Sequence, residues 1–496
     1  MATQTLSCSL ALIPELLAEV VRWLPSPLDI ASLDCTSRLF HLGAPRSPVE
    51  EGLRLRAAAV GRAVEAALPA GETSWTQWLL WEERRLLLAC TPVVASCAFH
   101  SVFVDAGGQL LTCGRDPSMI PGIVPGGADP SEVPSLLGQE AEGVNESLVP
   151  RVVVGLGGVR IRTVAAGEFH SLACSDEGVT YSFGFGSDGQ LGHGVYLFEP
   201  TPRAIAALQG VHISAVAAGA AFSLALSRTG ALYSFGEGIW GALGHGDWNN
   251  QHTPLLVAAL QGVRVVAVAA NAMASLALGE AGEVYSFGYS FYLFPEENQH
   301  TPLAIPELQG VRVCAMATGG EHSLVVSREG RLYSFGMPRS RLALGHGEDI
   351  GYTPDIQPLY QPMPRLVTAL QGVRVLAVAA GHDHSLALSD TGEVYSFGGV
   401  ALRWELTVYG GFPELGRVCE TNLTPVVIPG LQGVHSISAG DRTSFAVTNA
   451  GVVYGWGIGV DIDGMPIPVL GLELMDNQCV PREYQGLQCL IHAHLS

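Results

Sequence analysis

Short apolar runs separated by glycine-rich turns follow one another along the chain from about residue 91. One unit contains a run of β-branched and small residues at 263–270, then two runs, 275–278 and 283–287, that alternate in character around Ala281-Gly282. Alternation over such short stretches, bounded by Gly, Asp, Asn and Pro, predicts antiparallel strands joined by tight turns. A fourth stretch, typified by residues 253–257, supplies a further strand.

The unit repeats along the chain. A fifteen-residue phrase ending in Tyr-Ser-Phe-Gly or a close relative recurs seven times, and the tyrosines at 181, 233, 285, 333, 395 and 454 lie 52, 52, 48, 62 and 59 residues apart. Self-similarity at such a period indicates a repeat architecture. About four strands in each of seven units predict an all-β fold, a seven-bladed β-propeller, because radial closure leaves only short, protected sheet edges.

A Gln-Gly pair accompanies the units and returns near the end of the chain. It occurs at 209, 261, 309, 371 and 432, and again at Gln485-Gly486. We therefore expect residues 485–490 to form a strand that pairs with the first blade and closes the ring.

Three phrases recur in one order: a glycine-histidine-serine-leucine phrase, the aromatic-glycine phrase, and a leucine-glycine-histidine-glycine phrase such as 189–194. In these motifs residues 91–496 resemble the regulator of chromosome condensation repeat family, which implies the propeller fold. The sequence departs from the family at Phe222 and Ala274, which replace the histidine, and around 289–298, where the leucine-glycine-histidine-glycine phrase is missing.

The repeated histidines favour a structural role. Because they recur at equivalent positions of separate blades, we expect each to form a hydrogen bond within its own blade rather than to converge on a metal. The repeated histidines of the blades are His100, His170, His322 and His384. We expect the same structural role for the histidines of the turns, which are His193, His245 and His346.

Residues 1–45 follow a different, helical pattern. From Ile13 to Leu24 the apolar residues recur at the three- and four-residue intervals of one helix face, and Pro25 ends the run. Residues 13–25 and 28–40 together resemble an F-box, with Thr36 in place of the usual valine. The positions expected to contact an adaptor are Ile13, Pro14, Leu16, Leu17, Val20, Val21, Leu24, Pro25, Leu28, Ile30 and Leu33.

The F-box resemblance implies docking of a Skp-type adaptor and recruitment to a cullin scaffold in a ubiquitin ligase. A bundle this short cannot bury its whole apolar stripe, and exposed apolar surface, at roughly 25 cal/mol per Å², favours a partner. The alternative is that the stripe packs only on the helices that follow it.

Residues 46–90, which follow the F-box-like segment, are predicted to form a helical spacer, with Ser74 and Gln77 as a capping box before the tryptophans 75, 78 and 81.

All 26 basic residues other than histidine are arginine, and the chain contains no lysine. A biased genome composition would explain this, but so would a ligase subunit that avoids modifying itself, which is our hypothesis. The absence excludes P-loop, protein kinase and pyridoxal chemistry, all of which need a lysine. With no G-x-S-x-G, His-Glu-x-x-His or Cys-x-x-Cys motif either, we expect a non-catalytic protein without metal or cofactor.

Charge indicates which partners to expect. Of the 26 arginines and 46 acids, residues 1–90 hold 8 and 10, which leaves 18 and 36 for the propeller. Such a surface repels nucleic acid and favours a basic protein substrate. The propeller resemblance alone would suggest guanine nucleotide exchange on a Ran-like GTPase, or a simple interaction scaffold. The tryptophan-rich phrases of the related plant ultraviolet-B photoreceptor are missing.

The apolar N-terminal stretch is interrupted by Glu15 and Glu19 and has no basic flank, so it predicts neither a signal peptide nor a membrane span. We expect the cytoplasm, the nucleus or both. Substrate contacts should come from the long loops 115–150, 337–365 and 399–425. Because aromatic residues and arginine dominate binding hot spots, the candidate contacts are Trp240, Trp248, Tyr292, Arg339, Arg341 and Trp404.

Overall fold

The chain divides into two compact units, and every residue that the computed structural model describes belongs to the second, Ala89–Ile491. The predicted F-box at 1–45 and spacer at 46–90 lie outside the described residues. The described ranges are 93–115, 137–139, 146–194, 198–289, 299–336, 343–347, 361–399, 415–417, 423–457 and 478–488.

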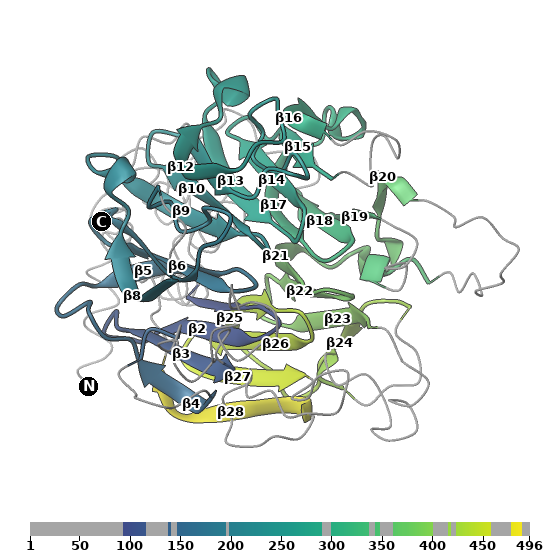
Figure 1. Cartoon of the computed structure of the whole chain (residues 1–496). Coiled ribbons are helices and arrows are strands. Elements are labelled where there is room, and N and C mark those ends of the chain that lie inside the picture. The colour runs from purple at the N-terminus through teal and green to yellow at the C-terminus, as the bar shows by residue number, and fades with distance from the viewer. Residues whose placement is uncertain are drawn as a thin grey trace, which may run out of the picture. The chain divides into compact units, whose positions relative to one another are not determined.

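The described residues form seven four-stranded antiparallel sheets, each built from strands consecutive in sequence (Figure 1). The first strand of each sheet contacts the first strands of the two neighbouring sheets, so these seven strands surround a common axis. This arrangement confirms the predicted seven-bladed β-propeller. Among the residues described, no helix is long and apolar enough to cross a membrane.

The blades are numbered in chain order, and their strands are given from the axis outward. Blades 1 to 3 are β1 Val94–Ser96, β2 His100–Val104, β3 Leu110–Arg115, β4 Glu146–Val152; β5 Ile161–Ala166, β6 His170–Ser175, β7 Thr180–Phe185, β8 Phe198–Ala204; and β9 Ile213–Ala218, β10 Phe222–Ser227, β11 Leu232–Gly236, β12 Gln251–Leu256. Blades 4 and 5 are β13 Val265–Ala270, β14 Ala274–Gly279, β15 Val284–Gly288, β16 Gln299–Ala304; and β17 Val313–Thr318, β18 His322–Ser327, β19 Leu332–Gly336, β20 Gln361–Leu366. Blades 6 and 7 are β21 Val375–Ala380, β22 His384–Ser389, β23 Val394–Gly398, β24 Val426–Val427; and β25 Val434–Ala439, β26 Thr443–Thr448, β27 Val452–Gly457, β28 Gln478–Gln488.

The Tyr-Ser-Phe-Gly phrase forms the third strand of its blade and fills the contact between blades. Its phenylalanine is fully buried; Phe287 of blade 4, for example, packs in one cluster with Leu224 and Leu243 of blade 3. Its glycine has a positive φ, and at Gly184 a Cβ would lie 2.6 Å from the carbonyl oxygen of Phe169, so no larger residue fits. The predicted core positions are thereby confirmed for Phe183, Phe235, Phe287, Phe335 and Phe397.

Five of the six Gln-Gly pairs lie in the connections between blades. Those at 209, 261, 309 and 371 each follow a short 3-10 helix whose last leucine is buried. The glycine then turns the chain into the first strand of the next blade, as Gly262 does with φ of 95°. These helices are η5 Ala206–Leu208, η6 Ala258–Leu260, η7 Pro306–Leu308 and η9 Thr368–Leu370.

The prediction for the tail was wrong about its partner. Gln485 belongs to β28, which pairs with β27 as the outer strand of blade 7, with Tyr454 opposite Glu483 (Figure 1). Blade 1 obtains its four strands from residues 94–152 and has no place for a further one. The tail still reaches blade 1 through a side chain, because the ring of Tyr484 lies 5.6 Å from that of Phe103.

The prediction that the buried histidines bond within their own blade was wrong for His170, His322 and His384, and incomplete for His100, whose Nδ1 atom lies 3.2 Å from Sγ of Cys97 in its own blade. The Nε2 atom of His170 in blade 2 lies 2.9 Å from the hydroxyl of Ser223 in blade 3, and the same contact recurs from His100, His322 and His384 to the following blade. Ser223 donates its own proton to the carbonyl of Gln190 at 2.8 Å, so the histidine Nε2 must be the donor to the serine. Each such histidine therefore joins two blades, and its burial lowers its pKa, to about 3 for His170.

The turn histidines, by contrast, do bond within their own blade, as predicted. The Nε2 atom of His193 lies 2.9 Å from the hydroxyl of Ser182, and His245 and His346 make the same contact with the equivalent serines. Two loops without the histidine do the same through another side chain, since Gln139 donates to Thr112 and Arg417 to Ser396. Blade 4 lacks the phrase, and within the described part of the chain its Ser286 hydroxyl has no hydrogen-bond partner.

Candidate functional site

One face of the propeller collects most of its irregular segments. Because the strands of a blade alternate in direction, the connections after the first and the third strand emerge on the same side, which we call the loop face. Between β1 and β28, every segment outside the described residues falls between a third and a fourth strand. The loops predicted to bind substrate, 115–150, 337–365 and 399–425, all begin on this face.

The connections after the first strands lie around the axis and are linked to one another by backbone hydrogen bonds. The amide of Glu168 donates to the carbonyl of Ala220 at 3.2 Å, and the amide of His382 to that of Asp441 at 3.0 Å. Gly320 donates to the carbonyl of His382 at 3.2 Å. Backbone hydrogen bonds between adjacent blades thus hold these loops together around the axis.

Acidic residues outnumber basic ones in these axial loops. The acids are Glu168, Glu321, Asp383 and Asp441, and the same loops carry His382 and Arg442. Burial and the nearby charge of Asp441 raise the pKa of Glu168. Burial also raises the pKa of Asp441, although His382 and Arg442 counteract it. A positive charge that approaches a carboxyl group with a raised pKa stabilises its ionised form.

His382 lies among these acids and forms a hydrogen-bonded pair with one of them. Its Nδ1 atom lies 2.8 Å from the Asp383 carboxylate, and this hydrogen bond raises the pKa of His382 to about 9. Burial alone would raise the pKa of Asp383, but the hydrogen bond and charge of His382 outweigh it and hold that pKa below its usual value. The pair is therefore a charged His⁺–Asp⁻ pair at neutral pH.

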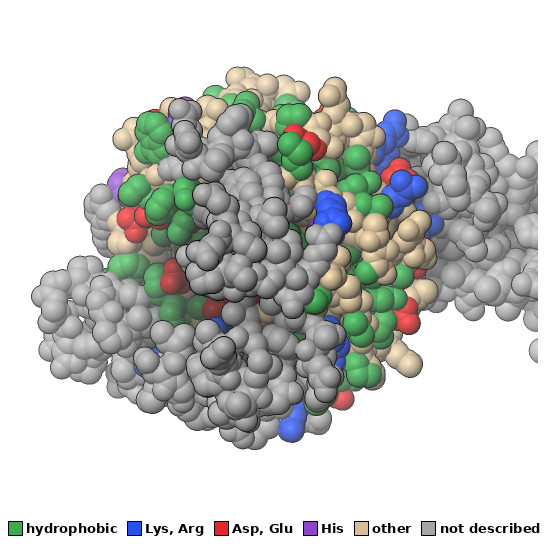
Figure 2. Space-filling model, turned by 90° about the vertical axis from the view of Figure 1, so that its right-hand side faces the viewer, with side chains coloured by type: hydrophobic (Ala, Val, Ile, Leu, Met, Phe, Trp, Pro, Cys, Tyr) green, Lys and Arg blue, Asp and Glu red, His purple; other side chains and the backbone are tan. Residues whose placement is uncertain are grey.

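Further out on the loop face, Glu237 and Asp188 extend the acidic region toward blades 2 and 3. Burial raises the pKa of Glu237, and the charges of Asp188 and Glu168 raise it further. On the side that Figure 2 shows, acidic and basic side chains are scattered among hydrophobic and other residues. Among the described residues, no group of three or more His, Cys, Asp or Glu could hold a metal ion.

An aromatic row crosses the loop face beside the acidic residues. Phe99 and Phe169, from neighbouring axial loops, stack with their ring centroids 5.5 Å apart. Phe169 meets Phe185 at 6.5 Å, and Phe185 meets Phe198 of the outer strand at 5.4 Å. All four side chains are partly exposed. The row therefore offers partly exposed aromatic rings, which are common in protein interfaces.

Sequence analysis missed this row. Its first two members share one signal, since each phenylalanine directly precedes the buried histidine of its blade. The strand that follows puts that position on the loop face. Phe185 and Phe198 carry no such signal, because their approach depends on how β7 and β8 pair, with Phe185 opposite Phe198.

Two of the six predicted substrate contacts are described. Trp240 is partly buried, and its ring packs edge-on against Tyr289 at 5.3 Å. Trp248 is 54% exposed and packs edge-on against His300 at 4.8 Å. Both therefore lie where blades 3 and 4 meet. Four positions lie outside the described residues: Tyr292, Arg339, Arg341 and Trp404.

The repeats match a known family. The model of the RCC1-like domain covers residues 138–488, which is more than half of the chain. The chain belongs to the RCC1-like domain family. The match confirms the propeller part of the resemblance; it does not extend to the F-box.

Two curated relatives share this domain. The human E3 ubiquitin-protein ligase HERC2 is 32% identical over 324 residues, which are 63% of this chain and 5% of that protein. The ultraviolet-B receptor UVR8 of Arabidopsis thaliana is 33% identical over 302 residues, 60% of this chain and 53% of the receptor. The matched region is thus a small part of the first relative and about half of the second.

Solved structures share the fold. Prp20p of Saccharomyces cerevisiae superposes with a TM-score of 0.59 at 21% identity, over 82% of this chain and 89% of that one. Human WBSCR16 gives a TM-score of 0.59 at 23% identity, over 76% and 93%. At these identities the likeness establishes the propeller and nothing about activity.

Proposed function

We propose that this protein is a substrate receptor of a cullin-based ubiquitin ligase, in which the N-terminal segment docks a Skp-type adaptor and the propeller binds a protein substrate. The observation that carries the proposal is the F-box-like phrase at 13–40 ahead of an RCC1-like propeller. HERC2, which shares this propeller type, is named as an E3 ubiquitin-protein ligase. In this proposal the chain positions substrate and performs no chemistry.

The loop face supports a role in substrate binding. It combines acids such as Glu168 and Asp441 with the aromatic row that begins at Phe99. Buried carboxylates favour a basic partner, and aromatic rings supply the apolar contact area of a hot spot. We therefore expect the substrate to be a basic protein, in keeping with the formal net charge of −20.

A pull-down of purified adaptor tests the proposal. The intact chain should retain the adaptor, whereas a Leu17→Asp, Leu24→Asp double variant should lose it, because two carboxylates on the apolar stripe cannot be buried against a partner. Trp248→Ala, which changes an exposed propeller residue, is the matched control and should retain the adaptor. A folded intact chain that binds no adaptor would contradict the proposal.

A second candidate is nucleotide exchange on a small GTPase. The structure of the related Prp20p is described together with its binding to Gsp1p and to histones, and histones are basic proteins of the kind an acidic propeller favours. Release of labelled GDP from a Ran-like GTPase measures this activity directly. Catalysed release by the chain, together with a failure to bind the adaptor, would make exchange the better account.

A further inference from the structure

The junction between blades 7 and 1, which we call the seam, differs from the other junctions. The described chain does not run across it from one blade into the next, because β1 is the first described strand and β28 the last. Thr443 replaces the buried histidine, and its hydroxyl lies 3.0 Å from that of Ser96. Phe103 occupies the β2 position where the other blades carry alanine or valine, and it packs on Phe445 at 5.7 Å and on Tyr484 at 5.6 Å.

A cavity of about 420 Å³ opens at the seam. It lies on the side opposite the loop face, where the turns between second and third strands emerge, because its lining includes Asp105 of one such turn and Val452 at the start of β27. Its volume falls in the range of about 300–1,000 Å³ that is usual for ligand pockets. The lining residues that matter here are Asp105, Leu111, Val452, Glu483, Tyr484 and Leu487.

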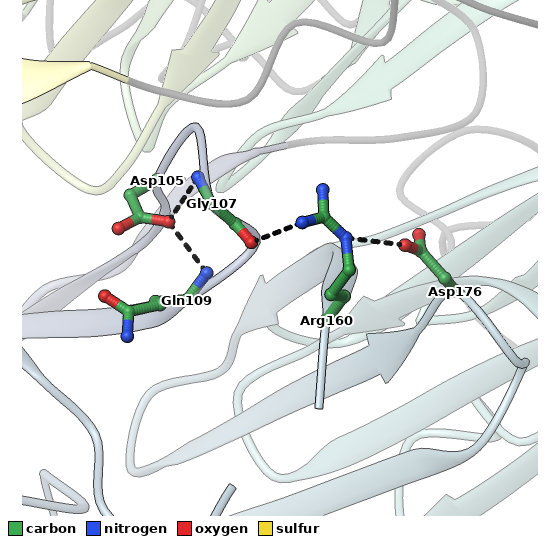
Figure 3. A network of polar contacts seen from close by, with 5 residues as sticks. All are labelled: Asp105, Gly107, Gln109, Arg160 and Asp176. Carbon is green, nitrogen blue, oxygen red and sulfur yellow. Dashed lines mark hydrogen bonds and ion pairs between the residues drawn. The ribbon is translucent and has the colours of Figure 1, made fainter. Parts of the chain in front are cut away.

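The polar end of the cavity consists of two carboxylates. Oδ1 of Asp105 accepts hydrogen bonds from the amides of Gly107 and Gln109, both at 2.8 Å, which fixes the carboxylate and leaves Oδ2 available (Figure 3). Glu483 on β28 is exposed. Within the described part of the chain, neither carboxylate has an ion-pair partner.

The basic side chain that contacts the turn after Asp105 is Arg160, and it already has two partners. Arg160 donates to the carbonyl of Gly107 at 2.8 Å and pairs with Asp176 at 3.4 Å, so it joins the turns of blades 1 and 2 (Figure 3). Arg264 forms the equivalent ion pair with Glu280 in blade 4. The seam has two carboxylates at its cavity but no such arginine bound to them.

We propose that the seam cavity binds an arginine side chain from a basic segment of a protein partner. The guanidinium would be held between Asp105 and Glu483, while Leu111, Val452 and Leu487 cover the aliphatic stem. This site is separate from the loop face and does not depend on adaptor docking. A planar cation with several donors matches two carboxylates better than the point charge of an ammonium group does.

The test uses the full chain and N-acetyl-argininamide as the probe, with binding measured by ligand-observed NMR or calorimetry. The matched ligand control is N-acetyl-citrullinamide, which has nearly the same shape but no charge. The wild-type chain should bind the arginine compound saturably and the citrulline compound at least about tenfold more weakly, a difference of about 1.4 kcal/mol. Equal binding of both compounds, or no saturable binding of the arginine compound, would overturn the proposal.

Variants locate the site. Asp105→Asn keeps an oxygen for the two turn amides, and Glu483→Gln keeps the side-chain volume, so the double variant should keep its melting temperature and lose at least about tenfold in affinity. Glu329→Gln, an exposed turn residue of blade 5, is the control and should bind within about twofold of wild type. Unchanged affinity in the folded double variant would place the binding elsewhere and refute this site.

Discussion

The serine that receives the buried histidine of the preceding blade allows a sharp test of how the blades are joined. The hydroxyl of Ser223 is fully buried and has two partners, Nε2 of His170 at 2.9 Å and the carbonyl of Gln190 at 2.8 Å. Ser223→Ala therefore leaves one donor and one acceptor without a partner. Each such loss costs about 1–3 kcal/mol, so the variant should lose about 2–6 kcal/mol.

The chain supplies its own control at the next junction. Ser275 is equally buried and donates to the carbonyl of Ala242 at 2.8 Å, but Phe222 stands where the histidine would be. Ser275→Ala should therefore leave one group unpaired and cost about 1–3 kcal/mol. Both changes remove the same atoms from equivalent strands, so their difference isolates the histidine contact.

The assay is urea denaturation of the propeller, followed by circular dichroism and by intrinsic fluorescence. We expect Ser223→Ala to reduce the free energy of unfolding by about 1–3 kcal/mol more than Ser275→Ala does. A double variant, His170→Phe with Ser223→Ala, should recover part of the loss because the unpaired donor is gone. Equal losses from the two single serine variants would refute the claim that the histidine joins the blades.

Three further predictions concern the propeller core. Burial lowers the pKa of His100 and His322 to about 4, so below pH 6.5 the unfolded chain binds protons that the folded chain cannot. The free energy of unfolding should therefore be full above pH 6.5 and fall as the pH is lowered toward 4. Urea titrations at several pH values should show a loss of up to about 1.4 kcal/mol per pH unit for each histidine. Gly381→Ala should cost about 1–3 kcal/mol in the same titration, because its Cβ would lie 2.5 Å from the carbonyl oxygen of Gly440, whereas Gly157→Ala, with open space around it, should stay within about 0.5 kcal/mol. Phe287→Ala should cost about 3–5 kcal/mol, and an unchanged melting curve would argue against its core position.

The repeat pattern was sufficient to predict the propeller because each blade is encoded by the same local signals. Alternation gives the strands, glycine gives the turns, and Phe287 and its equivalents recur where every blade needs a large core residue. The contacts between blades were harder to predict. A histidine that recurs once per blade can bond within its blade or to the next one, and only the spatial arrangement shows that His170 reaches Ser223.

The tail illustrates a second limit of sequence reasoning. Gln485-Gly486 looks like the anchor that precedes a first strand, but β28 is an eleven-residue strand whose pairing with β27 decides its place. Two copies of the leucine-glycine-histidine-glycine phrase were also missed, because only their Leu-Gly pair remains and the histidine is absent. Their glycines, Gly138 and Gly416, still pack against Phe183 and Trp456 of the following blade.

The candidate loop face was only partly predictable. The long loops after the third strands were expected to carry the binding surface, and the negative charge of the propeller was evident from composition. The aromatic row was not, since Phe99 and Phe198 are about a hundred residues apart and meet their neighbours only through blade packing. The His382–Asp383 pair was not predictable either, because no spacing in the sequence reveals it.

The most direct test of the proposed receptor role is reconstitution with purified adaptor and cullin, followed by analytical ultracentrifugation. We predict one particle that contains the full chain, the adaptor and the cullin, and that forms only when the adaptor is present. The Leu17→Asp, Leu24→Asp variant should sediment alone while its propeller stays folded. A wild-type chain that remains separate from the adaptor–cullin complex would contradict the account.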